Sequence, residues 1–146
     1  MAKTLQDAVA LGRRDSFLVV VATVRLDGSV QSSVVNAGVL AHPTTGADVV
    51  GFVTYGPTKL RNLRARPRLA VTFRAAWTWV TVEGRAQLIG PEDPDPSIDA
   101  ERLRLLLREV YTAAGGQHDD WAAYDRTMIE ERRTAVFVVP DRIYGV

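Results

Sequence analysis

Residues 52–64 read FVTYGPTKLRNLR, and this stretch does most to decide the fold. An apolar, β-branched pattern stops at Gly56-Pro57. Proline suits the first turn of a helix, because its missing N–H is not needed there. A strand that turns directly into a helix brings free backbone N–H groups and the positive end of the helix dipole to one point. The stretch therefore predicts a strand, a tight turn and a helix whose first turn can bind an anion such as phosphate.

Two β-branched runs precede this stretch. They cover residues 16–25 and 29–41 and are separated by Asp27-Gly28. This dipeptide supplies the positive φ that a tight hairpin turn requires. The sequence therefore predicts an antiparallel hairpin here, followed by a further strand over residues 48–54.

The chain after residue 64 contains two more strand patterns and then helical ones. Residues 69–74 and 77–89 alternate between apolar and polar side chains, as half-buried antiparallel strands do, and we expect them to pair. The remaining elements expected are helices over residues 4–14, 97–114 and 119–133 and a last strand over residues 134–139.

The order of these elements excludes a Rossmann-type fold. Strands dominate the first half and the two longest helices come late, so the alternation of strand and helix that builds a parallel sheet is missing. The sequence therefore predicts a mainly β (α+β) protein. We expect a closed or split antiparallel barrel of about six strands with peripheral helices, in a single domain over residues 1–146.

Composition and charge exclude several classes of protein. The 146 residues include no Cys, so the chain offers no disulfide, no thiolate nucleophile and no Cys-ligated metal. No apolar segment approaches the ~20 residues of a membrane helix, and the first residues do not resemble a signal peptide. A net charge of +1 gives no general attraction to nucleic acid or to membranes. We therefore expect a soluble cytoplasmic protein.

One cation stands out by its type. The chain has sixteen Arg but only two Lys, at positions 3 and 59, and the compact ammonium of Lys suits phosphate as a point charge. Residues 49–82 carry six cations and no acid, which indicates a discrete anionic ligand. The alternative is that Lys59, Arg61 and Arg64 form a solvated face of the helix.

Other chemistry has little support in the sequence. The two His, at positions 42 and 118, are far apart, so neither a metal site nor a Ser-His-Asp arrangement is expected. The run of Arg at positions 64, 66 and 68 has no stacking aromatics among its cations, which argues against nucleic-acid binding. No catalytic residue can be named from the sequence.

Residues 54–73, which begin TYGPTK, resemble the cofactor-phosphate segment of the flavin and deazaflavin split β-barrel superfamily, which includes the pyridoxamine 5′-phosphate oxidases. More closely, they resemble the B-type F420-dependent reductases of actinobacteria. The resemblance extends over almost the whole chain in the same order. Its further segments are the Asp27-Gly28 turn and residues 31–36, 77–84 and 115–128.

The resemblance implies a six-stranded antiparallel split β-barrel with peripheral helices. It also implies a homodimer that binds coenzyme F420 at the subunit interface. Such a protein transfers a hydride from the reduced deazaflavin to a small conjugated organic acceptor. The implied cofactor-binding positions lie around the phosphate and its polar tail, along the strand that faces the ring, and on an aromatic strand contributed across the dimer. They are Thr54, Thr58, Lys59, Arg61 and Asn62; Ser33, Val34, Val35 and Asn36; and Trp77 and Trp79.

Alternatives to this interpretation stay open. Without the resemblance, Ser33 and Asn36 read equally well as exposed sheet residues, and the tryptophans as interface core. FMN-binding members commonly carry Ser-Arg-Lys where this chain has Pro57-Thr58-Lys59, so one guanidinium is missing, which favours F420. The remaining alternatives are an FMN-dependent oxidoreductase of the same fold and an F420-binding protein without catalysis.

Overall fold

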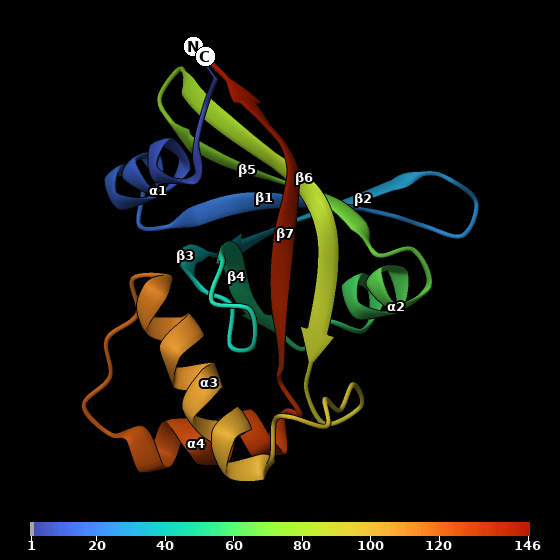
Figure 1. Ribbon diagram of the computed structural model, residues 1–146, viewed down its shortest axis with the longest axis vertical. Coiled ribbons are helices and arrows are strands. Elements are labelled where there is room, and N and C mark those ends of the chain that lie inside the picture. Colours follow the sequence, from blue (N-terminus) through green and yellow to red (C-terminus); the bar gives the residue numbers. More distant parts are fainter. Residues whose placement is uncertain (1) are drawn as a thin grey trace.

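The computed structural model describes residues 2–146, which form seven strands and four helices (Figure 1). The strands make one antiparallel sheet in the order β2-β1-β5-β6-β7-β4-β3. This arrangement confirms a mainly β, antiparallel split barrel with peripheral helices. The elements are α1 (Leu5–Arg14), β1 (Leu18–Val24), β2 (Val30–Asn36), β3 (Gly38–Ala41), β4 (Asp48–Thr54), α2 (Pro57–Ala65), β5 (Arg68–Ala75), β6 (Thr78–Ile89), α3 (Ala100–Ala113), α4 (Trp121–Glu130) and β7 (Thr134–Gly145).

The predicted number of six strands was wrong, because the strand expected over residues 29–41 is two strands. β2 pairs with β1, whereas β3 pairs with β4. Between them, Ala37 is fully buried and donates its N–H to the carbonyl of Phe17 at 3.0 Å, outside both ladders. At Gly38 an added Cβ would lie 2.0 Å from the carbonyl oxygen of Ala113, so the chain here must pass close to α3. A β-branched pattern does not reveal such a change of partner.

The first hairpin forms as predicted. Gly28 has φ +86°, a conformation that favours glycine. The N–H of Arg25 donates to the carbonyl of Ser29 at 2.8 Å, and the Asp27 carboxylate accepts the N–H of Ser29 at 2.9 Å. The turn residues therefore satisfy the backbone groups that the tight turn would otherwise leave free.

A β-bulge lets the sheet bend. The register of β6 on β7 shifts between Glu83 and Gly84, and an added Cβ on Gly84 would lie 2.0 Å from the carbonyl oxygen of Val139. Pro140 lies opposite this bulge, a position where a strand tolerates proline. The last strand, which we expected to end at Val139, therefore continues to Gly145.

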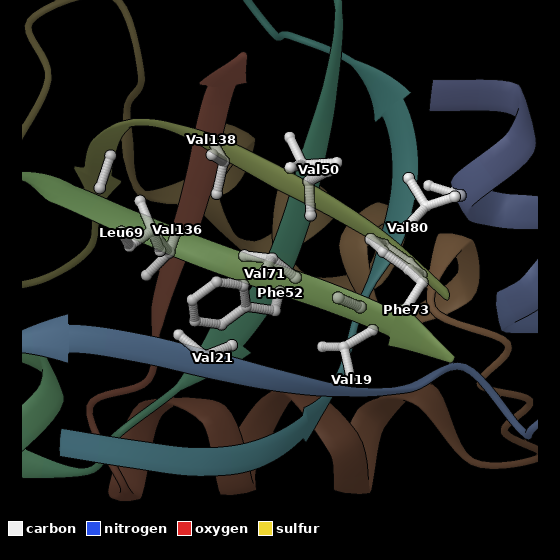
Figure 2. Packing of buried hydrophobic residues seen from close by; sticks show 14 of the residues in the cluster. Val19, Val21, Val50, Phe52, Leu69, Val71, Phe73, Val80, Val136 and Val138 are labelled. Atoms are coloured by element: carbon white, nitrogen blue, oxygen red, sulfur yellow. The ribbon is translucent and has the colours of Figure 1, made fainter. Parts of the chain in front are cut away.

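The barrel interior is filled by side chains from five strands (Figure 2). Phe52 of β4 is fully buried and lies near Val21 of β1, Val71 of β5 and Val136 of β7. The two end strands of the order also meet here, because the partly buried Val35 of β2 and Val39 of β3 pack against this cluster. The sheet must therefore curl back on itself.

A second buried cluster lies outside the barrel, between the sheet and the two late helices. It joins Val49 of β4 and Phe137 of β7 to Leu106 and Val110 of α3 and Met128 of α4. β4 and residues 134–138 of β7 are therefore buried on both faces, which explains why they read as nearly continuous apolar runs rather than as alternating ones.

The two late helices begin later than predicted because an aspartate caps each of them. The side chains of Asp99 and Asp120 accept backbone N–H groups of Arg102 and Ala123, which places both aspartates just before the first turn. α1 is capped in the same way by Thr4. In residues 2–146, no helix is long and apolar enough to span a membrane, and the cytoplasmic location stays a prediction.

Candidate functional site

The first turn of α2 differs from that of the other helices. Side chains cap α1, α3 and α4, whereas Gly56 precedes α2 and provides no capping hydrogen bond. The first turn of α2 also contains no acidic residue. Its free N–H groups and the positive end of the helix dipole are therefore available to an anion from outside the chain.

Lys59 lies in this turn and is buried. Its exposed fraction is 6%, and its ammonium lies 5.7 Å from the centre of the Phe52 ring. Within residues 2–146 it has neither an ion pair nor a hydrogen-bond partner. Burial lowers the pKa of Lys59 below its ordinary value. A buried ammonium without a carboxylate is costly, and an anionic ligand would supply the missing charge.

Most other cations of the basic segment are engaged within the chain. Arg64 pairs with Asp93 at 2.6 Å, and Arg68 pairs with Asp141 at 2.8 Å. Arg61 is exposed. The solvated-face interpretation therefore describes Arg61 and Arg64, but it does not describe Lys59.

Two of the predicted phosphate-side residues are buried in packing contacts. Asn62 donates to the Thr23 hydroxyl at 3.0 Å and accepts from the Arg66 guanidinium at 3.4 Å, so its amide joins α2 to β1. Thr54 is buried at the end of β4, and its hydroxyl accepts the N–H of Gly56 at 3.4 Å. Thr58, by contrast, is exposed in the first turn of α2.

The predicted ring-side residues of β2 alternate between the two faces of the strand. Val35 packs against the barrel interior, whereas Val34 is 63% exposed on the outer face. Ser33 shares the inward direction of Val35, and Asn36 shares the outward direction of Val34. The hydroxyl of Ser33 is buried and has no hydrogen-bond partner in the described chain. Of these side chains, Ser33 is thus the one that a bound polar group would satisfy.

The two predicted tryptophans lie elsewhere. Trp77 is 94% exposed in the turn between β5 and β6, outside the strand in which we expected it, next to Ala76 with φ +54°. Trp79 is half-buried on β6, and its ring centre lies 6.0 Å from that of Tyr144 in a T-shaped arrangement. Figure 1 shows the β5–β6 turn beside the two chain termini, away from α2. The tryptophans and Lys59 therefore do not form one site within a single chain.

A cavity of about 480 Å³ opens between α3, α4 and the ends of β2 and β4. Tyr111, His118 and Tyr124 line it, with ring centres 4.9 Å apart for the two tyrosines and 5.7 Å apart for His118 and Tyr124. Asn36 and Arg133 lie on its wall as well. Of the residues proposed from the sequence, Asn36 alone takes part in it.

The polar atoms of this cavity are largely engaged. The Tyr124 hydroxyl donates to the carbonyl of Leu107 at 2.9 Å, and burial raises the pKa of Tyr124. The Tyr111 hydroxyl donates to the carbonyl of Gln117 at 3.2 Å. The Arg133 guanidinium pairs with Glu131 at 2.7 Å and stacks 3.9 Å from the centre of the Tyr55 ring. Tyr55 belongs to the loop that enters α2, so the cavity and the first turn of α2 are neighbours.

Sequence reasoning did not identify this cavity. Its lining comes from residues as distant as Ser16 and Arg133, and spacing gives no sign that they meet. The available signal was the density of aromatic rings between Tyr111 and Tyr124. Residues 115–128, which include part of this segment, were identified only as one part of the family resemblance.

Comparison with known proteins gives a consistent picture. The family described as pyridoxamine 5′-phosphate oxidase matches residues 5–139. A conserved hypothetical protein from Mycobacterium tuberculosis is 19% identical, with a TM-score of 0.67 over 99% of this chain and 85% of the other. A protein described as an F420 reductase is 18% identical, with a TM-score of 0.62 over 99% and 98%. An FMN-binding protein from Nostoc punctiforme, related to pyridoxamine 5′-phosphate oxidase, is 14% identical, with a TM-score of 0.60 over 99% and 86%. At these identities the three structures show a shared fold.

Proposed function

The chain belongs to the pyridoxamine 5′-phosphate oxidase family, and on that premise we propose that it is an F420-dependent oxidoreductase acting on a small conjugated organic acceptor. The observation that carries the proposal is the buried ammonium of Lys59, which has no partner among residues 2–146, in the uncapped first turn of α2. A phosphorylated cofactor of the flavin type satisfies both features. Pro57-Thr58 in place of Ser-Arg, together with the likeness to an F420 reductase, favours a deazaflavin.

The residues of the chain fit such a cofactor. Lys59 and the N–H groups of the first turn of α2 would hold its phosphate, with the exposed Thr58 and Arg61 beside them. The hydroxyl of Ser33, which has no hydrogen-bond partner in the described part of the chain, would bind the ring from β2, which is an edge strand of the sheet. When bound and reduced, a deazaflavin supplies a hydride, which an electron-poor conjugated acceptor takes up together with a proton from solvent.

A homodimer is part of the proposal. Leu18, Val20 and Val34 are 41%, 45% and 63% exposed on the outer face of β1 and β2, where Val20 lies opposite Val34. Contiguous apolar side chains on a sheet face are typical of an interaction surface. A second copy docked on this face would cover them, and Trp77 and Trp79 would then be available to the partner's cofactor.

Turnover tests the proposed function. Protein mixed with reduced F420 and 1,4-naphthoquinone should restore the absorbance of oxidised F420, and Lys59→Ala should lower kcat/KM at least about tenfold by weakening cofactor binding. Lys3→Ala, which changes the chain's other lysine, is the matched control and should leave the rate unchanged.

Two other outcomes would replace the proposal. Tight F420 binding without oxidation by a panel of quinones, enones and nitro compounds would leave an F420-binding protein without catalysis. A protein that is yellow as purified and releases FMN on denaturation would be an FMN-dependent oxidoreductase, a function that the likeness to an FMN-binding protein supports.

A further inference from the structure

The cavity between α3 and α4 is walled by aromatic rings. Tyr111 and Tyr124 meet at 63°, and His118 and Tyr124 meet at 67°, so the rings present edges and faces to one space. Ala123 and Thr127 of α4 complete this side of the wall. A cavity of about 480 Å³ with such walls suits a flat conjugated molecule, which can pack between ring faces and edges.

The charge of the lining restricts the ligand. Of the cavity-lining residues that the structure describes, Arg133 alone carries a permanent charge, and its guanidinium is committed to Glu131 and to the ring of Tyr55. A carboxylate or phosphate inside the cavity would therefore lack a free cation. The cavity thus favours an uncharged ligand, and it differs in this respect from the turn that holds Lys59.

One hydrogen-bond donor remains for a ligand. The Nδ1 atom of His118 accepts the N–H of Asp120 at 3.0 Å, so a neutral ring carries its proton on Nε2. Nε2 has no hydrogen-bond partner among residues 2–146. His118 is exposed and lines the cavity, so its Nε2–H is available to a carbonyl oxygen on a molecule bound there.

The cavity also adjoins the strand that would face the cofactor ring. Asn36, the last residue of β2, lies on the cavity wall, and its amide donates to the carbonyl of Ser16 at 2.9 Å, which holds the two chain segments together. Ser16 and Phe17 have φ of +55° and +59°, in the left-handed region that non-glycine residues rarely adopt. The Asn36 contact thus supports a strained turn at the rim of the cavity.

We propose that this cavity binds the hydride acceptor, as an uncharged planar conjugated carbonyl compound whose oxygen accepts the Nε2–H of His118. The proposal rests on the proposed function, because it locates the second substrate of that reaction. It assigns the cofactor's phosphate to α2 and the acceptor to α3 and α4, so the two ligands should bind together.

Binding to the cofactor-free protein tests this assignment. The variant Trp77→Phe/Trp79→Phe leaves Trp121 as the one tryptophan, and Trp121 packs 5.2 Å from the Tyr124 ring. In this variant, 1,4-naphthoquinone should quench the fluorescence saturably. Adding Ala123→Leu, which fills the cavity from α4, should weaken binding at least about tenfold. Ala122→Leu, the same change at the exposed neighbouring position, should leave binding unchanged.

Two analogues test the chemistry of recognition. Naphthalene lacks the carbonyl oxygen and so reports on packing alone. 2-Naphthoate carries a negative charge, and it should bind at least about tenfold more weakly than 1,4-naphthoquinone. His118→Phe keeps an aromatic ring and removes the donor, so it should weaken 1,4-naphthoquinone binding about fivefold and leave naphthalene binding unchanged.

The outcomes separate this proposal from the proposed function. Equal binding of 1,4-naphthoquinone to the Ala123→Leu and Ala122→Leu variants, or no binding at all, would overturn the acceptor site. Competition between F420 and 1,4-naphthoquinone, or loss of F420 binding in Ala123→Leu, would make the cavity part of the cofactor site and also overturn it. Failure of the wild-type protein to bind F420 would overturn the proposed function, whereas the naphthoquinone measurements would still decide what the cavity binds.

Discussion

Lys59 shows most clearly how a single residue can be held ready for a ligand. Its ammonium is buried near Phe52, and no residue from 2 to 146 pairs with it, whereas Arg64 in the same helix has Asp93. The chain therefore bears a cost in the cofactor-free state that a bound phosphate would offset. Sites of this kind commonly trade stability for binding.

Replacing Lys59 by Met should separate these two effects. Lys59→Met removes the buried charge and keeps most of the length of the side chain, so the free energy of unfolding at pH 7 should rise by about 1 kcal/mol, or about 2–4 °C in Tm. Affinity for F420 should fall at least about tenfold. Urea unfolding and cofactor titration measure the two quantities, and a variant that is less stable than wild type would contradict this account.

The same residue predicts a pH dependence. Burial places the pKa of Lys59 in the folded protein below its ordinary value of 10.5, so the unfolded chain binds more protons between the two values. The stability of the wild type relative to Lys59→Met should therefore rise with pH through that interval and level off on both sides of it. Urea unfolding of both proteins from pH 7 to pH 11 tests the sign, and a relative stability that falls with rising pH would refute it.

At the scale of secondary-structure elements, a carboxylate introduced into the uncapped first turn of α2 should compete with the cofactor's phosphate for that turn. Thr58→Asp places a carboxylate in that turn, where it should stabilise the helix by about 0.5 kcal/mol and repel a phosphate. We expect a small rise in Tm together with at least a tenfold loss of F420 affinity. Thr58→Asn, of the same size but neutral, is the control, and equal F420 affinities of the two variants would argue against a phosphate at α2.

The bend between β6 and β7 makes a separate prediction. Gly84→Ala brings a Cβ against the carbonyl oxygen of Val139, so it should destabilise the protein by about 1–3 kcal/mol in urea unfolding. At Gly56 an added Cβ meets nothing closer than the Thr54 hydroxyl at 3.8 Å, so Gly56→Ala should cost less. An equal loss of unfolding free energy in Gly84→Ala and Gly56→Ala would show that the backbone at the bulge can shift to make room for a Cβ.

Elements defined by local chemistry were predictable from the sequence, and elements defined by distant partners were not. The Asp27-Gly28 turn and the helix that follows Pro57 are set by their own residues, and both formed as expected. The break at Ala37 depends on Phe17 and on α3, and the continuation past Pro140 depends on the bulge in β6. Neither dependence leaves a mark in the local pattern.

One part of the candidate site was likewise predictable from the sequence, and another part was not. Lys59 was recognisable because its residue type is rare in this chain. The structure adds that it is buried and has no partner within residues 2–146. The cavity lined by Tyr111, His118 and Tyr124 was not recognisable, because α3 and α4 must first pack on β4 and β7 before their rings meet. A role for Asn62 beside the phosphate stays a prediction, and its buried contacts with Thr23 and Arg66 show a second use for that side chain.

At the scale of the whole molecule, the outer face of β1 and β2 should hold two copies together. Val34→Glu places a charge at the centre of that face, opposite Val20, so it should convert a dimer into monomers in light scattering and lower F420 affinity with it. Ile129→Glu, at a 70% exposed position on α4, is the matched control and should leave the dimer intact. A Val34→Glu protein that remains a dimer would place the interface elsewhere.

The cofactor itself decides the central claim. Titration of the purified, cofactor-free protein with F420 and with FMN in parallel, followed by quenching of cofactor fluorescence, compares the two directly. We predict micromolar or tighter binding of F420, weaker binding of FMN, and loss of F420 binding in Lys59→Ala but not in Lys3→Ala. Preference for FMN, or binding of neither cofactor, would contradict the claim.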